Sequence, residues 1–124
     1  MPGRSILIVD DDVEQTEVLA VRLGRLGYRT LKAHRGHSGL ALARQHRPDL
    51  VILDLGLPDA DGLDICAELD GAPPTCGTPI IIVSGMEGAD IVRRSRGAGC
   101  RYYVRKPYDP NALLVLIEQE IGRV

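Results

Sequence analysis

The sequence predicts an α/β fold in which helices cover both faces of a parallel sheet. Three runs of four residues contain only Ile, Leu and Val, at 6–9, 50–53 and 80–83. Runs that do not alternate with polar residues are typical of strands buried on both faces. Amphipathic stretches separate these runs, and the alternation of strands with helices predicts right-handed βαβ crossovers.

The remaining elements follow from weaker patterns in the same rhythm. Two further strands are predicted at 28–33 and 101–104. Apolar residues at helical spacing predict helices at 13–26, 36–46, 63–70 and 110–121, and the alternation of elements places a fifth helix at 87–96. Asp109 before Pro110 is a typical start of a helix. The stretch 87–96 contains Gly88 and few apolar residues, which predicts a weakly packed and mobile helix.

Length, composition and charge set limits on the class of protein. The chain has 124 residues, of which 44% are hydrophobic and 26% are charged, and its net charge is −2. These values predict one globular domain, residues 1–124, with no effector domain. Direct binding to nucleic acid usually needs an excess of basic residues, which this chain lacks, so we do not expect it. No apolar run could span a membrane or act as a secretory signal, and the three cysteines form no CxxC pair, so we expect a cytoplasmic domain with reduced thiols.

Polar side chains stand at the ends of four predicted strands. Asp10 and Asp11 follow the first strand, Asp54 the third, Ser84 the fourth and Lys106 the fifth. Ligand sites of such sheets lie beyond the carboxyl ends of the strands, so we expect these side chains to converge. Three carboxylates in one pocket are costly unless a cation neutralises them, and Mg²⁺ prefers such oxygen ligands. A carboxylate nucleophile beside a metal ion and a lysine predicts formation of an acyl phosphate.

The ordered motifs resemble those of the receiver domains of two-component response regulators, including the chemotaxis regulators. The resemblance covers nearly the whole chain and is carried by residues 6–12, 48–62, 79–84 and 103–107. Separations of 44, 30 and 22 residues along the series Asp10, Asp54, Ser84 and Lys106 also fit the family. The resemblance implies a flavodoxin-like (βα)5 fold with five parallel strands in the order 2-1-3-4-5.

In this family the domain is a phosphorylatable switch rather than an enzyme that acts on a diffusing substrate. The resemblance implies that Asp54 accepts a phosphoryl group from a phosphohistidine on a sensor histidine kinase or a phosphotransfer protein. The domain would catalyse only its own phosphotransfer and autodephosphorylation. Its output would be control of a downstream protein or a fused effector, with no direct contact to nucleic acid or membrane.

The resemblance also assigns the ligands of Mg²⁺, or of Mn²⁺ in its place. Asp11 and Asp54 would bind the ion directly, Asp10 would bind it through a water, and Gly56 would contribute its backbone carbonyl. Lys106 would hold the phosphoryl group. The Lys106–Pro107 bond is often cis in this family, and an X-Pro bond is where the cis form costs least.

Two further residues would transmit the signal. Ser84 would hydrogen-bond the phosphoryl group, and Tyr103 resembles the switch aromatic that turns inward when the serine moves. The usual output surface of the family is formed by the fourth helix, the fifth strand and the last helix. Here it would carry Arg93, Arg94, Arg96 and Tyr103. The arginines favour an acidic partner or disfavour a phosphorylation-dependent homodimer, and a merely solvated face is the alternative.

Other positions receive local roles. Gly56 and Met86 stand two residues after Asp54 and Ser84 and offer no side chain that orients an attacking water, so we expect slow self-dephosphorylation. Asp12 is expected to cap the first helix, and Asp61 with Gly62 to form a turn. The histidines at 34, 37 and 46 receive no phosphoryl or metal role, and Cys100 is expected to be buried.

Three other functions stay open at this point. A degenerate receiver would keep the fold and act as a phosphorylation-independent interaction domain. A haloacid-dehalogenase-like phosphatase would need a second aspartate two residues after Asp54, where Gly56 stands. A flavodoxin-like cofactor carrier would place a flavin phosphate after the first strand, where three aspartates would repel it.

Overall fold

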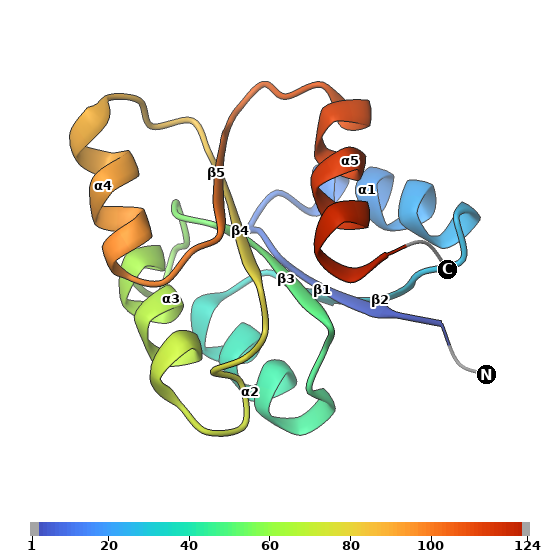
Figure 1. The fold of residues 1–124 in the computed structure, drawn as a ribbon, viewed down its shortest axis with the longest axis horizontal. Helices are drawn as coiled ribbons and strands as arrows, with labels where there is room; N and C mark the ends of the chain where they lie inside the picture. The colour runs from blue at the N-terminus through green and yellow to red at the C-terminus, as the bar shows by residue number, and fades with distance from the viewer. Residues whose placement is uncertain (1–2, 123–124) are drawn as a thin grey trace.

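The computed structural model describes residues 3–122, which form a five-stranded sheet and five helices (Figure 1). Strands and helices alternate along the chain, as the hydrophobic pattern predicted. The strands are β1 (Ser5–Val9), β2 (Arg29–Ala33), β3 (Leu50–Asp54), β4 (Ile80–Ser84) and β5 (Tyr102–Arg105). The helices are α1 (Val13–Arg25), α2 (Gly36–His46), α3 (Gly62–Gly71), α4 (Ala89–Gly97) and α5 (Pro110–Ile121). None of these helices is long and apolar enough to cross a membrane.

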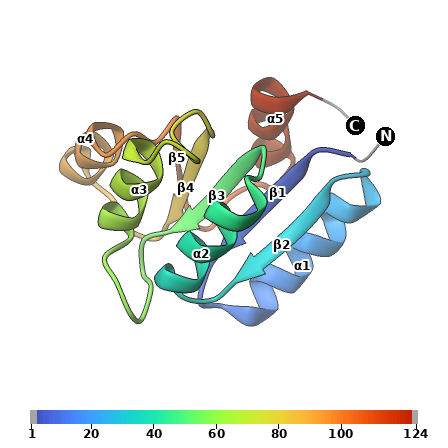
Figure 2. The ribbon, with the colours of Figure 1, turned by 90° about the horizontal axis from the view of Figure 1, so that it is seen from below.

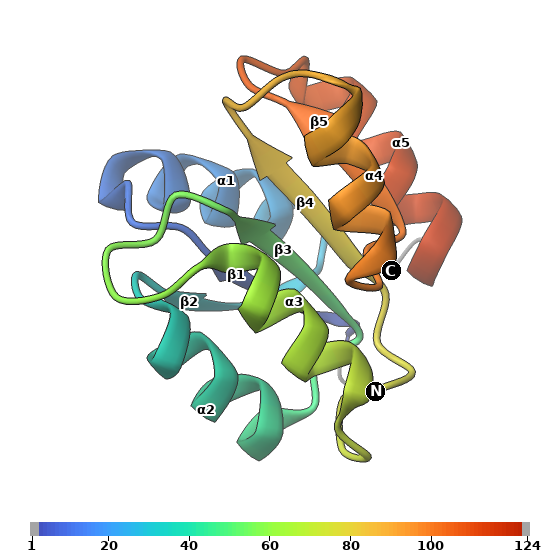
Figure 3. The ribbon, with the colours of Figure 1, turned by 90° about the vertical axis from the view of Figure 1, so that its left-hand side faces the viewer.

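All neighbouring strands run parallel, in the order β2-β1-β3-β4-β5. This confirms the strand order that the family resemblance implied. Helices α1 and α5 cover one face of the sheet and α2, α3 and α4 cover the other (Figures 2 and 3). The direction of winding reverses at β1, which pairs with both β2 and β3. Ligand sites of such sheets lie at the carboxyl ends of the strands beside this reversal.

Two apolar layers hold the helices on the sheet. Along β1, Ile6 and Ile8 belong to the layer under α1 and α5, while Leu7 and Val9 belong to the layer under α2 and α3. The residues of β1, β3 and β4 are therefore buried on both faces, which is why these runs show no alternation. Cys66 and Cys100 are buried in the second layer, and burial raises the pKa of the Cys66 thiol to about 12.

Aspartate side chains begin three of the helices. Asp12 caps α1 by accepting a hydrogen bond from the backbone N–H of Gln15 at 3.1 Å, as the sequence predicted. Asp61 caps α3, and Asp109 caps α5 ahead of Pro110. A side-chain acceptor at this position satisfies a backbone donor that the helix itself leaves unpaired. At α2 the preceding residue, Arg35, provides no such cap.

The observed bounds differ from the predicted ones in ways that matter for function. Asp54 and Ser84 are the last residues of β3 and β4, because strand pairing continues one residue beyond each apolar run. The fourth helix begins at Ala89 rather than 87, since Gly88 before it has a φ of 118°. In α4 only Ser95 is fully buried, which fits the predicted weak packing; its mobility stays a prediction.

Candidate functional site

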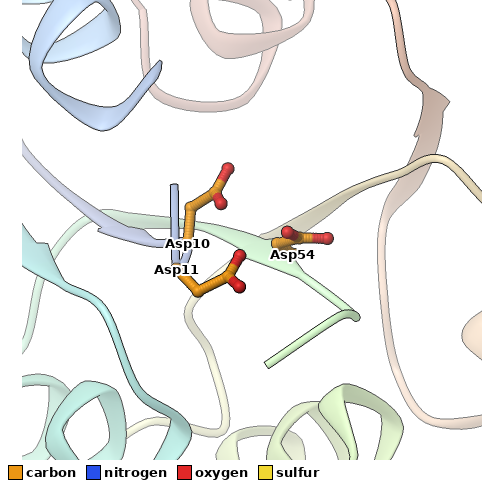
Figure 4. Close-up of side chains that lie close together, drawn as sticks. All are labelled: Asp10, Asp11 and Asp54. Atoms are coloured by element: carbon orange, nitrogen blue, oxygen red, sulfur yellow. The ribbon is translucent and has the colours of Figure 1, made fainter. Parts of the chain in front are cut away.

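Three carboxylates meet where the carboxyl ends of β1 and β3 lie side by side. Asp10 and Asp11 directly follow β1, and Asp54 ends β3 (Figure 4). One oxygen from each side chain lies within 4.8 Å of the others. Asp10 and Asp54 are each 9% exposed, whereas Asp11 is open to solvent. The sheet therefore brings together the aspartates that the sequence predicted would converge.

Lys106 is the cation of this cluster. Its Nζ lies 3.0 Å from Oδ2 of Asp10 and 3.4 Å from Oδ2 of Asp54. Its backbone N–H donates to the carbonyl of Ser84 at 2.8 Å, which holds the chain after β5 against the end of β4. The Lys106–Pro107 bond is cis. One ammonium group thus contacts two carboxylates that would otherwise repel each other.

The surroundings change the acidity of two of these groups. Burial raises the pKa of Asp54, although the N–H of Gly56 and the charge of Lys106 oppose the rise; the nearby Asp10 adds to it. Burial alone would lower the pKa of Lys106, but hydrogen bonds and charge attraction from Asp10 and Asp54 raise it overall. Lys106 is therefore charged at neutral pH, and ionising the carboxyl group of Asp54 costs more free energy than ionising an aspartate in water.

Backbone contacts fix the loop that carries the aspartates. Oδ1 of Asp10 accepts the N–H of Asp12 at 2.9 Å. The hydroxyl of Thr16 donates to the carbonyl of Asp12 at 2.8 Å. Nδ1 of His34 lies 2.9 Å from the Asp10 carbonyl and must carry the proton, because a carbonyl only accepts. Neither Thr16 nor His34 forms part of a motif, so neither supporting contact was predicted from the sequence.

The donor set suits a hard divalent cation. Oxygens on opposite sides of Mg²⁺ are about 4 Å apart, so side-chain oxygens within 4.8 Å of one another are close enough for one ion with small adjustments. The backbone N–H of Gly56 donates a hydrogen bond to Oδ1 of Asp54 at 3.2 Å. A Cβ at Gly56 would meet only Oδ1 of Asp54, at 3.9 Å, which is an ordinary contact, so the space beside this carboxylate is open. The residues present therefore fit a magnesium site.

Ser84 and Tyr103 both contact Met86, in the loop before α4. The hydroxyl of Ser84, which is 2% exposed, accepts the N–H of Met86 at 3.1 Å. The hydroxyl of Tyr103 donates to the Met86 carbonyl at 2.6 Å, and its ring packs against the layer under α2 and α3. A single peptide segment thus joins the end of β4 to the outer surface of β5.

The arginines that the sequence predicted for an output surface all lie on α4. Arg93, Arg94 and Arg96 are exposed on this helix. Arg93 pairs with Asp90 at 2.8 Å. Helix α4 packs against β5, and Arg93, Arg96 and Tyr103 line one groove there. Arg94 is exposed on the same helix but does not line this groove.

The chain belongs to the response regulator receiver domain family, whose model matches residues 6–118. It is a receiver domain of two-component systems, a class that works as a phosphorylatable switch and binds Mg²⁺ at an acidic cluster. Among curated proteins it is 36% identical to PilH of Pseudomonas aeruginosa, over 90% of this chain and 93% of that protein. It is 29% identical to the polar-differentiation response regulator DivK of Brucella anthropi, over 96% and 97% respectively.

Longer relatives and solved structures agree with this assignment. The chain is 32% identical to the transcriptional regulatory protein KdpE of Mycobacterium tuberculosis over 95% of its own length, but it spans only 51% of that protein. A CheY-like receiver domain from Methanospirillum hungatei has a TM-score of 0.90 at 29% identity, covering 96% of this chain and 94% of that one. A Burkholderia pseudomallei response regulator with a phosphorylated aspartic acid, a calcium ion and citrate has a TM-score of 0.84 at 25% identity, covering 90% and 65%.

Proposed function

We propose that Asp54 accepts a phosphoryl group from a phosphohistidine on a sensor histidine kinase or a phosphotransfer protein, in a reaction that needs Mg²⁺ or Mn²⁺. The observation that carries this proposal is the contact of Lys106 with two of three clustered carboxylates. A charge-dense group of this kind suits transfer of a phosphoryl group, where positioning and charge neutralisation supply most of the catalysis. The phosphorylated aspartate of the Burkholderia pseudomallei protein supports the same chemistry.

The reaction is a transfer between two nucleophiles. An ionised oxygen of Asp54 attacks phosphorus, a P–O bond forms, and the P–N bond to the donor histidine breaks with the electron pair leaving on the imidazole. Asp11, Asp54, the Gly56 carbonyl and, through a water, Asp10 would hold the metal ion, which supplies positive charge to the phosphoryl oxygens. Lys106 can exchange a carboxylate contact for a phosphoryl oxygen, because its ammonium already lies between the acidic groups.

The signal would leave the site through Ser84 and Tyr103. A serine hydroxyl can accept one hydrogen bond and donate another, so Ser84 can donate to the phosphoryl group. A movement of Ser84 would displace Met86, because the Ser84 hydroxyl accepts the Met86 N–H. The Met86 carbonyl in turn accepts the hydrogen bond of the Tyr103 hydroxyl. The surface of α4, β5 and α5 would change in this way and control a partner protein. We treat residues 1–124 as the receiver domain.

Intact mass spectrometry after incubation with acetyl phosphate tests this proposal. We expect a gain of one phosphoryl group that needs Mg²⁺ and is absent in Asp54→Asn. The matched control is Asp64→Asn, which removes a carboxylate exposed on α3 and should leave the gain unchanged. Some receiver domains do not accept phosphoryl groups from small molecules such as acetyl phosphate, so a purified phosphorylated phosphotransfer domain serves as a second donor. No gain from either donor, together with no Mg²⁺ binding, would instead indicate a phosphorylation-independent interaction domain.

A further inference from the structure

We propose that a groove beside α4 binds an acidic segment of a partner protein through arginine contacts and one apolar anchor. The groove is defined by Met86, Val92, Arg93, Arg96, Tyr103 and Arg105, and has a volume of about 670 Å³. The inference rests on the proposed function, because the groove lies on the surface assigned there to output. It adds the chemical class of the partner.

Charge is strongly uneven along the chain. Residues 86–105 contain five arginines and two carboxylates, a net charge of +3, whereas the whole chain has a net charge of −2. The rest of the chain is therefore acidic, with a net charge of −5. A cationic face on an acidic domain attracts an acidic partner to one surface and repels it from the others.

The arginines of the groove are available to a partner. Arg93 and Arg105 have ion pairs with Asp90 and Glu87, but their side chains are 77% and 60% exposed. Exposed pairs of this kind contribute little to stability and are easily exchanged. Arg96 has no ion pair with the residues that the structure describes. Guanidinium groups bind carboxylates in a two-point geometry, which suits them to Asp and Glu side chains.

The groove also has an apolar wall. Met86 is 51% exposed, and Val92 and the ring of Tyr103 line the same groove. An unbranched thioether adapts its shape to a partner side chain, and an aromatic ring supplies a flat contact surface. An apolar side chain of the partner would therefore be buried between α4 and β5.

The same features favour a protein partner over nucleic acid. Glu87 and Asp90 are paired with Arg105 and Arg93. Their charges act alike on an acidic peptide and on a phosphate backbone, so the apolar wall of the groove decides between the two. An apolar anchor suits a protein side chain, whereas most contacts to nucleic acid are made to phosphates and sugars. Met86 also connects the groove to Ser84, so occupancy of the groove can respond to phosphorylation.

Fluorescence anisotropy with labelled peptides tests the inference. The probe is a twelve-residue peptide of alternating Glu and Leu, and its counterpart has Lys in place of every Glu. We expect the acidic peptide to bind the chain after treatment with acetyl phosphate and Mg²⁺, and the lysine peptide to bind at least tenfold more weakly. The double variant Arg93→Glu, Arg96→Glu should weaken the acidic peptide at least tenfold. The milder double variant Arg93→Gln, Arg96→Gln removes both charges without reversing them. It should also weaken binding of the acidic peptide, which separates loss of the arginine contacts from a disturbance of α4 by charge reversal.

The control variant Arg25→Glu, Arg29→Glu makes the same change in net charge at the end of α1 and on β2. Arg29 lies on β2, at the edge of the sheet opposite β5, and Arg25 ends α1, which packs against β2, so binding should stay within twofold. Three results would overturn the inference. The two peptides could bind equally well, the variant Arg25→Glu, Arg29→Glu could lose as much binding as Arg93→Glu, Arg96→Glu, or a single-stranded oligonucleotide could bind as tightly as the acidic peptide. Arginine-dependent binding without any phosphoryl gain by mass would keep the groove and contradict the proposed function. A phosphoryl gain without peptide binding would keep the proposed function and contradict the proposed groove. Self-association of the chain in place of peptide binding, measured by ultracentrifugation, would also overturn the inference.

Discussion

The carboxylate of Asp59 caps a helix that begins 23 residues earlier in the chain. Oδ1 of Asp59 accepts the N–H of Gly36 at 2.7 Å, and Oδ2 accepts the N–H of His37 at 3.1 Å. These donors are at the start of α2, where Arg35 contributes no side-chain cap. The loop after Asp54 is therefore tied to a different helix, and this contact holds the segment that contains Gly56.

Replacing Asp59 with alanine should lower the midpoint of urea unfolding, because two backbone donors lose their acceptor. These same hydrogen bonds lower the pKa of Asp59. A depressed pKa adds stability above the ordinary pKa of 3.8, and the gain disappears as the pH falls through the lowered value. The difference between wild type and Asp59→Ala should therefore shrink in acid. Asp64→Ala, a surface carboxylate on α3, should show no such difference.

Asp54→Asn should be more stable than the wild type in the absence of divalent cations at neutral pH. Burial raises the pKa of Asp54 in the folded state, so its ionisation costs free energy of folding. The two proteins should have similar stability well below pH 3.8, and the difference should open as the pH rises through the raised pKa. Urea unfolding across this range measures it. Added Mg²⁺ should reduce the difference, and a variant that is less stable throughout would contradict the interpretation.

Lys106→Ala should bind Mg²⁺ more tightly and yet accept a phosphoryl group more slowly. The ammonium competes with the metal ion for the oxygens of Asp10 and Asp54, so its removal should raise the affinity several-fold. Phosphotransfer loses the group that would neutralise the phosphoryl oxygens. Isothermal titration and the rate of mass gain separate the two effects. Lys32→Ala, at an exposed pair with Glu17, should change neither quantity.

Ser95→Ala should stabilise the domain by about 1 kcal/mol, because a buried unpaired hydroxyl carries a desolvation cost. Ser95 is fully buried and its hydroxyl has no partner within the described part of the chain. Ser38→Ala is the matched control, since that hydroxyl donates to the Arg35 carbonyl at the start of α2. Both variants gain the same helix propensity. Equal shifts in the thermal midpoint would show that the burial of Ser95 has no separate cost.

Gly56→Asn should shorten the lifetime of the phosphorylated state. A Cβ at Gly56 meets only Oδ1 of Asp54, at 3.9 Å, so an amide side chain fits beside the reacting group and can orient water. The wild type should keep its phosphoryl group for minutes to hours. The decay of the phosphorylated mass after removal of the donor measures both rates. Decay of the wild type within seconds would contradict the expectation drawn from Gly56 and Met86.

Much of this protein could be predicted from the sequence. The runs of Ile, Leu and Val predicted the strands, and the polar residue after each run predicted which side chains would converge. Both predictions depend on local pattern, because burial on two faces excludes polar residues from a strand and admits them again at its end. The order of the strands came from the family resemblance, since hydrophobic runs of equal strength do not specify their neighbours.

Only the tertiary structure decided the contacts that support the site. Asp59 reaches α2, His34 holds the Asp10 carbonyl, and Tyr103 bonds to Met86. Each contact joins residues that are far apart in the chain and have no shared period or motif. Their pairing depends on which loops the packed sheet brings together and on where each side chain points. A local pattern contains neither, because hydrophobic burial selects the elements while long-range packing sets the geometry between them.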